Sequence, residues 1–588
     1  MILQALTSLY EALAPKGEVP KEGWSREKIS FALGIDENGD LLRITPLFKP
    51  GDMPKGKKKE EPQEMTVPAA VKRTSGAAAN FLWDNSSYIL GVSLKKGEDD
   101  AEREKQRNKD IKCFEACREL HHSMLDGMEY PAAKAVLNFL DKWEPQKAEE
   151  NNLVAQYAKE ILSGANMVFR FNGGYVHDDP QLASVWQKAN AKQKDNIGQC
   201  LVTGALDEIQ KTHPTIENVQ GANPAGAALV SFNASAFCSY NNEQNQNAPV
   251  GKYAAFAYTT ALNHLLADRK NVHRIGDAAV VCWAENADKQ YEDFAAEVFF
   301  GDNVDKSDEQ RLSALRTSLK LLADGLPCKE MDLDPDRKFY ILGLSPNAAR
   351  LAVRFFYCDS FGKIAGNIYK HHERLEIVRP SYDKFPILPL WKLLSATVNP
   401  NAKDKTPNAA MAGAVARAVF SGGRYPASLL ECTFLRIKAE RNITRERAAI
   451  IKAYYLRNPN EKCPKEVLTV SLNENSKNIP YTLGRLFSVY EEIQQAANPG
   501  INTTIKDRYF GSAAAMPATV FPILSNLAQK HLRKLSDAQR VYLDKKVMTL
   551  KSVLGEQYPA HMSLPEQGSF DLGYYHQTQA RYTKKEDK

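Results

Sequence analysis

The hydrophobic periodicity of the chain changes near residue 380, and this change most constrains its fold. Before that point, strand-length apolar runs such as Val280–Ala284 and Phe339–Leu344 alternate with helical stretches such as Ala101–Trp143. From about Trp391 onward helical spacing dominates, in Ala410–Val419, Thr444–Leu456, Thr482–Ala497 and Ser536–Val553. The sequence predicts an α+β N-terminal domain over 1–380 and an all-α helical bundle over 381–588.

Local signals predict individual elements within this frame. Met1–Leu13 has apolar residues at helical spacing and predicts a short amphipathic helix. The pair Asn38–Gly39 tolerates positive φ, so Phe31–Phe48 predicts a hairpin around it. Tyr253–Leu266 has helical character, and we expect a further helix over Asn347–Phe356, directly after a proline.

Composition excludes several classes of protein. The nine Cys residues are scattered and no secretory leader pattern opens the chain, so a disulfide framework is not expected. No apolar run reaches the roughly 18 residues of a membrane span. We expect a cytoplasmic protein without a membrane contact. The net charge of +6 is too small to drive nucleic-acid binding by itself, so the clustering of cations matters more.

Catalytic and metal-binding patterns are incomplete. Gly51–Lys57 matches half of a phosphate loop, but Lys58 stands where a Ser or Thr would bind Mg²⁺. Cys113, Cys117 and His121 share a helix face, and core packing explains them better than three ligands of a metal. His177–Asp178 and His371–Glu373 have no companion ligands nearby in the sequence. We expect no enzyme activity, no metal and no cofactor.

The segment Val71–Asn85 is the first candidate binding loop. Lys72 and Arg73 can contact phosphates or a guanine, and Gly76 allows a close backbone approach. Asn80 or Asn85 can bond a base edge, and two hydroxyls, Thr74 and Ser75, lie between the cations and the glycine. The alternative is a capped core helix with a solvated basic end.

The segment Ser239–Pro249 is the second candidate. Its amides, Gln244, Asn245, Gln246 and Asn247, donate and accept hydrogen bonds without charge. They would suit minor-groove edges or a point where DNA strands separate. The alternative is an ordinary polar loop.

Several strings in the N-terminal half resemble one known family. They are Met1–Leu6, Trp24–Ser25 with Ile29–Leu33, Val71–Gly76 with Asn80–Asn85, and Asn247–Pro249 followed by Ala255–Asn263. Weaker similarity continues through Gly343–Leu351, Val353–Phe356 and Tyr481–Leu486. Together these strings resemble the Csd-type large subunit of the type I-C CRISPR surveillance complex, Cascade, over essentially the whole chain.

The resemblance implies a non-catalytic protein of antiviral defence. Such a subunit checks the protospacer-adjacent motif (PAM) in duplex DNA, promotes strand separation and R-loop formation, and docks a trans-acting helicase-nuclease. Its implied partners are the crRNA-bound backbone subunits, the subunit that binds the crRNA end, a small subunit, double-stranded target DNA and the displaced single strand. The alternatives are a metal-dependent nuclease or RNA-processing subunit, and a general nucleic-acid-binding scaffold.

The resemblance also implies that the C-terminal helices are made separately as the small subunit. A start within Val467–Val470 would release 467–588, and it would need a non-AUG codon because no Met lies between Met411 and Met516. We expect six cations to follow the displaced strand: Arg485, Lys506, Arg508, Lys530, Arg533 and Lys534. The alternative is a covalent bundle with a solvated basic face.

Overall fold

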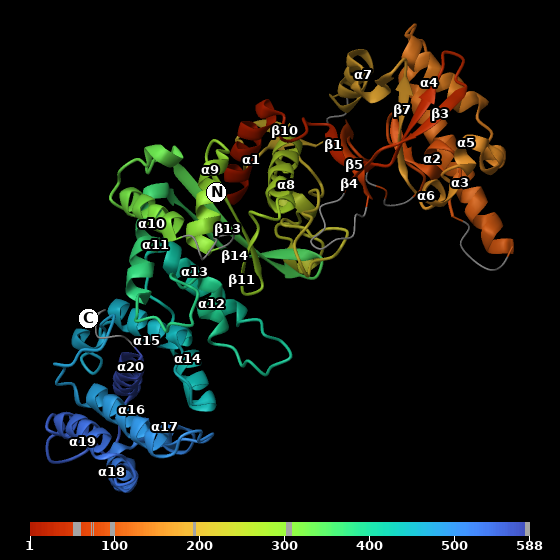
Figure 1. Ribbon diagram of the computed structural model, residues 1–588. Helices are drawn as coiled ribbons and strands as arrows, with labels where there is room; N and C mark the ends of the chain where they lie inside the picture. The colour runs from red at the N-terminus through yellow and green to blue at the C-terminus, as the bar shows by residue number, and fades with distance from the viewer. Residues whose placement is uncertain are drawn as a thin grey trace. The chain divides into compact units, whose positions relative to one another are not determined.

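The computed structural model describes residues 1–50, 60–71, 73, 76–94, 100–191, 196–301 and 309–582 (Figure 1). The chain forms two compact units. The N-terminal unit comprises Tyr10–His213 and Phe232–Thr260. The C-terminal unit comprises Met1–Leu9, Pro214–Ser231 and Ala261–Lys588. The units therefore divide the chain at points other than residue 380, while strands end by residue 360 and the rest of the described chain is helical.

A mixed sheet forms the centre of the N-terminal unit. Its order is β3-β2-β7-β6, with β8 on β7, and the bounds are β2 (Phe31–Ile35), β3 (Leu41–Pro46), β6 (Trp83–Asn85), β7 (Asn166–Phe171) and β8 (Gly174–Tyr175). Strands β2 and β3 are the predicted hairpin, and Gly39 in its turn has φ of 82°. A side chain at Gly39 would also overlap the backbone of Phe139, so only glycine fits there.

Helices cover this sheet and close its core. α3 (Asp100–Leu125) and α4 (Pro131–Lys142) confirm the helical prediction for this region. α4 buries Ala133, Val136 and Leu140 beside β2 and β7. The other elements of the unit's first part are β1 (Trp24–Ile29), β4 (Phe48–Pro50), β5 (Glu60–Pro68), α2 (Ser86–Ile89), α5 (Asn152–Ala155), α6 (Ala158–Leu162) and α7 (Pro180–Ala191). Strands β1, β5 and β4 form a separate antiparallel sheet.

Long irregular segments follow α7. In their described part, from 196 on, they carry a short ribbon of β9 (Ile197–Gln199) and β10 (Leu206–Glu208), and two turns of 3₁₀-helix at Ser235–Phe237 and Gln244–Asn247. α8 (Lys252–Ala267) then confirms the helix predicted over Tyr253–Leu266. At the start of the chain, α1 (Ile2–Leu13) confirms the predicted N-terminal helix.

The C-terminal unit begins with an antiparallel sheet of four strands. Their order is β11-β12-β13-β14, with bounds β11 (His273–Ile275), β12 (Ala278–Ala284), β13 (Lys338–Asn347) and β14 (Arg350–Ser360). The helix predicted over Asn347–Phe356 is wrong, because β14 occupies it. A turn with Ala348 at φ of 54° lets β14 pair along β13. The backbone partners offered by β13, together with the aromatic and branched residues of β14, outweigh the local helical spacing.

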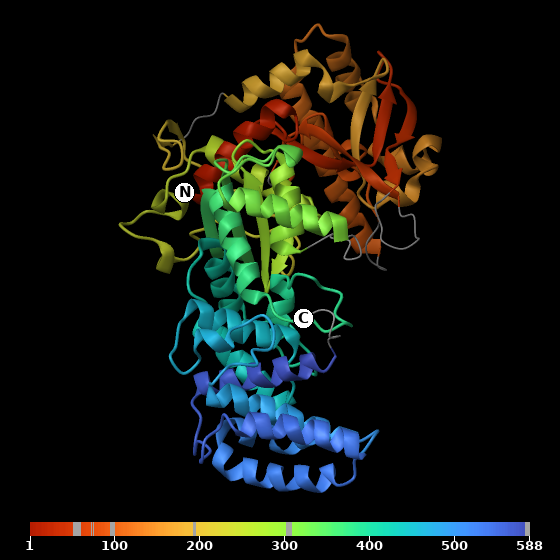
Figure 2. The same cartoon turned by 60° about the vertical axis from the view of Figure 1, so that its left-hand side comes forward.

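This unit is otherwise built mainly of helices, and the described chain after β14 has helices and no strand, as predicted for 381–588. Its helices are α9 (Lys289–Ala295), a π-turn at Ala296–Phe300, α10 (Glu309–Ala323), α11 (Phe361–Leu375), α12 (Leu390–Ser395), α13 (Ala409–Ser421), α14 (Ala427–Glu440), α15 (Arg445–Arg457), α16 (Ile479–Ala497), α17 (Ile505–Ala515), α18 (Pro517–Leu532), α19 (Asp537–Lys551) and α20 (Leu564–Ala580). Figure 2 shows the last of these, in blue, stacked across one another. None of the helices in the described ranges is long and apolar enough to cross a membrane.

Helix α20 is the central element of the C-terminal helices. Every residue from Gln567 to Gln577 is buried, which is unusual for a surface helix and typical of one enclosed by others. It packs on α16 and also on α15. Gly484 and Gly573 let the backbones of α16 and α20 touch, since a side chain at Gly573 would overlap the carbonyl oxygen of Tyr481.

This contact predicts that Gly573→Ala destabilises the protein by about 3 kcal/mol, because the obstructing atom is backbone and cannot rotate away. Gly511→Ala in α17 is the matched control, since a side chain there meets nothing within 4 Å. It should stabilise by about 0.5–1 kcal/mol through the better helix propensity of Ala. Urea unfolding of the two variants measures both effects, and equal stabilities would refute a tight crossing of α16 and α20.

Candidate nucleic-acid interface

The loop between β5 and β6 is organised around the buried carboxylate of Asp84. Asp84 lies on β6 and is 1% exposed. Its Oδ2 accepts from the backbone N of Asn80 at 2.8 Å, and its Oδ1 accepts from the backbone N of Asn85 at 2.8 Å. The Arg73 guanidinium donates to the same carboxylate. One side chain thus joins both ends of the loop.

Arg73 is held inside this loop by three interactions. Besides its ion pair with Asp84, its Nε donates to the Ala78 carbonyl at 2.7 Å, and its guanidinium lies 3.9 Å from the ring centre of Tyr88. Burial raises the pKa of Asp84, while the bonds from Arg73 and the two backbone N–H groups act against that rise. The Arg73 charge is therefore engaged in folding the loop.

His121 fixes the other side of the loop. Its Nε2 accepts from the backbone N of Leu82 at 2.9 Å, and its Nδ1 donates to the Cys117 carbonyl at 2.7 Å. Leu82 has φ of 63°, a costly conformation for a leucine, and this bond helps to hold it. Burial lowers the pKa of His121 to about 4. His121 is a neutral, fully bonded core residue on α3.

The structure separates the residues predicted for this loop. Lys72, Thr74 and Ser75 lie outside the described residues. Asn80 is buried, and its Oδ1 accepts from the backbone N of Val71 at 2.8 Å. Asn85 caps α2, with its Oδ1 accepting from the backbone N of Ser87 at 3.0 Å. Gly76 is exposed with φ of 83° and open space around it. Asn80 is placed to shape the loop, whereas Gly76 lies on its surface.

The amide-rich segment Ser239–Pro249 is held together by its own side chains. Asn245 is buried and donates to the carbonyls of Gln210 at 2.7 Å and Val250 at 3.4 Å. Asn247 accepts from the backbone N of Ser239 at 2.7 Å and donates to the Gln244 carbonyl at 2.9 Å. These two amides have structural partners. Gln244 and Gln246 are exposed, and Gln246 also accepts from the backbone N of Glu243 at 3.3 Å.

The C-terminal cations do not form one exposed set. Arg485 is buried inside the bundle, where its Nε donates to Gln577 Oε1 at 3.1 Å and its Nη1 donates to the Asn473 carbonyl at 3.3 Å. The prediction that Arg485 lies on a phosphate-tracking surface is therefore wrong. It failed because α20 covers α16, which helical spacing alone does not reveal. Lys506 is half-buried, 5.2 Å from the Tyr574 ring centre, and burial lowers its pKa. The exposed members are Arg508, Lys530, Arg533 and Lys534.

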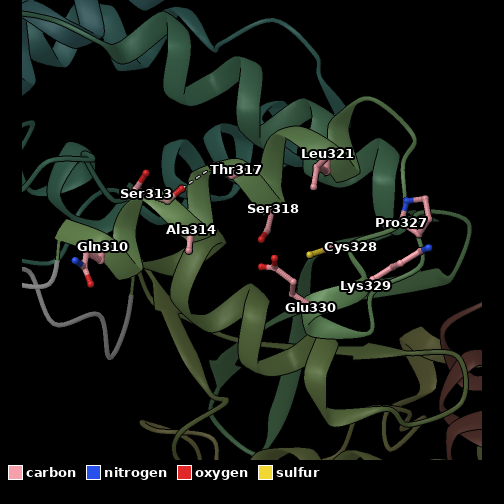
Figure 3. Close-up of a pocket in the computed structure, with 10 residues that line it drawn as sticks. All are labelled: Gln310, Ser313, Ala314, Thr317, Ser318, Leu321, Pro327, Cys328, Lys329 and Glu330. Carbon is pink, nitrogen blue, oxygen red and sulfur yellow. Dashed lines mark hydrogen bonds between the residues drawn. The ribbon is translucent and has the colours of Figure 1, made fainter.

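A cleft of about 720 Å³ lies between α10 and the turn Pro327–Glu330 (Figure 3). Ser313, Thr317 and Ser318 of α10 face it, with Cys328 and Glu330 opposite. Glu330 is the one carboxylate among the ten lining residues, and the Thr317 hydroxyl donates to the Ser313 carbonyl at 3.0 Å. The expectation of no enzyme activity stays a prediction.

The histidines considered as metal ligands are dispersed. His177 is buried with its Nε2 3.7 Å from Asp178 Oδ1, and burial lowers its pKa. His371 bonds the Tyr425 hydroxyl at 2.6 Å. Among the residues that the structure describes, no three His, Cys, Asp or Glu side chains come together as a metal site. The phosphate-loop match at Gly51–Lys57 lies outside the described residues.

Comparison with protein-family models identifies the family of this chain. The family model described as CRISPR-associated protein (Cas_Csd1) matches residues 6–582. The chain belongs to the CRISPR-associated Csd1 family. The resemblance seen in the sequence is thus confirmed over nearly the whole length, consistent with the large subunit of a type I-C complex. No curated protein matches the chain with significant similarity.

Burial of His121 predicts that the stability of the protein depends on pH through this residue. Its folded-state pKa of about 4 lies below the ordinary value near 6.5, so its contribution is present above pH 6.5 and lost as the pH falls toward 4. His121→Gln should lower the unfolding free energy at pH 7, and this difference from wild type should shrink by about 2 kcal/mol at pH 5.

His122→Gln is the control on the same helix. Bonds to Asp141 and Asp126 raise the pKa of His122, so its contribution to stability is lost as the pH rises. The difference in unfolding free energy between His122→Gln and wild type should therefore shrink with rising pH, opposite to that of His121→Gln. Urea unfolding at several pH values gives the unfolding free energy of each variant and of wild type. The difference between variant and wild type removes the contributions of the other histidines, which are the same in both. A pH-independent difference for His121→Gln would contradict a neutral buried imidazole.

Proposed function

We propose that this chain is the non-catalytic large subunit of a type I-C Cascade. It recognises the PAM in duplex DNA, promotes strand separation and helps to recruit the helicase-nuclease. The family match over residues 6–582 is the observation that carries the proposal. In such complexes guide pairing reads the target sequence, and protein needs to read only a short duplex motif. A chain with a basic loop suits that task.

Within the loop we assign different roles to the two neighbouring cations. Lys72 contacts the duplex directly, at a phosphate or a guanine. Arg73 acts as a positioning residue, because its guanidinium already bonds Asp84 and the Ala78 carbonyl. We assign Thr74, Ser75 and Gly76 to the DNA as well, because in the sequence they lie between the two cations and Asn80. The division rests on the bonds of Arg73, and Lys72 is assigned to DNA as the other cation of the segment.

The two roles predict different salt dependences. Lys72→Ala should weaken DNA binding by about 1–3 kcal/mol and, if it removes a phosphate contact, reduce the slope of log K against log[salt] by about 1. Arg73→Ala should weaken binding and lower the stability of the N-terminal unit while the slope stays unchanged. Titrations of the assembled complex at several salt concentrations measure affinity and slope together.

The control is Lys159→Ala, which removes an exposed cation of α6 in the same unit. It should change neither affinity nor slope. The purified complex must also contain a processed guide RNA and the backbone subunits, since their absence would favour a general nucleic-acid scaffold. If the Lys72→Ala complex binds DNA with several PAM sequences as tightly as wild type does, the loop does not have the DNA-contacting role assigned to it.

We further propose that the C-terminal helices are also made as a separate small subunit. Val467 ends a 3₁₀ turn in the segment between α15 and α16, so a start near it keeps α16–α20 in one piece. In the full chain α20 packs against α15, and the Tyr575 hydroxyl donates to the Val378 carbonyl at 2.7 Å. The separate subunit would lose both contacts, so we expect the complex to replace them. Four exposed cations, Arg508, Lys530, Arg533 and Lys534, remain for the displaced strand.

Expression from native codons should give an additional band whose first peptide maps near Val467. Synonymous recoding of 467–470 should remove that band and weaken binding of the displaced strand, because the charges of the small subunit are lost. Mass spectrometry of the purified complex identifies the product. A complex with full-length chain alone, unchanged by recoding, would refute the internal start.

A further inference from the structure

The tip of the amide-rich segment presents one aromatic ring to solvent. Tyr240 is 96% exposed, and Phe237, three residues before it, is 46% exposed. The ring of Tyr240 therefore contributes little buried area to the fold and is accessible to a ligand. Tyr240 and Asn241 also have positive φ values of 54° and 61°, which residues with side chains rarely adopt.

The segment around Tyr240 is built to maintain this strained geometry. Asn247 donates to the carbonyls of Asn242 at 3.1 Å and Gln244 at 2.9 Å, and it accepts from the backbone N of Ser239 at 2.7 Å. These bonds hold the backbone directly before Tyr240, at Ser239, and shortly after it, at Asn242 and Gln244. Asn245 then anchors the segment to Gln210 and Val250. Strain of this kind persists only where surrounding bonds over-determine it, and it is concentrated at functional sites.

The surroundings of the ring fit a nucleobase better than a protein surface. A stable protein interface buries about 800 Å² on each partner around an apolar centre. Here a single ring projects from a segment of amides, with exposed Gln244 and Gln246 after it. Every nucleobase has a face that can stack on an aromatic ring. Uncharged amides both donate and accept, so they can bond the edge of any base.

We propose that Tyr240 stacks on an unpaired nucleobase of the opened target, with Asn245 and Asn247 as the scaffold that positions it. The inference rests on the proposed function, because it assumes that DNA is opened at this subunit. The DNA contact that the sequence assigned to the amides is thus made by the ring of Tyr240, and Asn245 and Asn247 hold that ring in place. The ligand is a base released from pairing, since a base within a duplex has both faces covered by its neighbours.

The test uses the assembled complex and a target with a short premelted bubble, in which 2-aminopurine replaces each unpaired base in turn. Stacking on Tyr240 should quench the fluorescence at one position. Tyr240→Ala should relieve that quenching and weaken binding by about 5- to 100-fold. Tyr240→Phe and Tyr240→Trp should behave as wild type, because they keep the ring face. Tyr240→Leu should resemble Tyr240→Ala.

Two controls separate stacking from other effects. Asn241→Gly keeps the positive φ and the ring, so it should bind as wild type. Tyr382→Ala removes an 83% exposed tyrosine of the C-terminal unit and should change nothing. Unchanged binding and quenching in Tyr240→Ala, while Lys72→Ala is impaired, would overturn the stacking and leave the proposed function intact. Loss of a protein subunit from the Tyr240→Ala complex would also overturn it, and a wild-type complex that ignores the PAM would refute the proposed function.

Discussion

The buried carboxylate of Asp84 is the interaction on which the candidate interface depends. A loop without regular structure leaves its backbone N–H groups without sheet or helix partners, and each buried group left unbonded costs about 1–3 kcal/mol. Asp84 accepts from two such groups and from Arg73. Removing it would leave two N–H groups without an acceptor and would leave Arg73 with the Ala78 carbonyl alone among these acceptors. The carboxylate thus ties Arg73, Asn80 and Asn85 to one another.

The second loop solves the same problem with amides instead of a carboxylate. Asn245 donates to two backbone carbonyls, and Asn247 both donates to and accepts from the backbone, so each one joins several backbone groups without placing a charge in the interior. Each loop therefore has buried polar side chains that bond its backbone, Asp84 and Asn80 in the first and Asn245 in the second. The residue types that recognise a base edge are the same types that complete a loop, and burial alone distinguishes the two uses. Asn80 and Asn245 are buried, whereas Gly76 and Tyr240 are exposed.

This ambiguity explains which features of the fold and the site could be predicted from the sequence and which could not. Hydrophobic periodicity predicted α3, α4, α8 and the C-terminal helices correctly, and the Asn38–Gly39 pair predicted its hairpin, because those signals are local. The strand β14 was missed because its partner β13 decides its conformation. Arg485 was misplaced because a distant segment, α20, covers it. Contacts made by residues far apart in sequence leave no trace in the local pattern, and the site residues depend on such contacts most.

The same internal pairing limits how strongly the protein can bind DNA by charge. Arg445 bonds Asp383, Arg447 bonds Glu440, and Arg73 bonds Asp84, so these cations are neutralised within the fold. With a net charge of +6 on 588 residues, few charges remain to release counterions from phosphates. In the proposed role, weak charge-driven binding would be an advantage, because the subunit would test many duplex sites and leave most of them. Retention at the correct site would then come from guide pairing, to which an opened duplex gives access. A protein that stabilises the opened strand by stacking instead of by charge would keep both properties, because stacking contributes only after the base has left its partner.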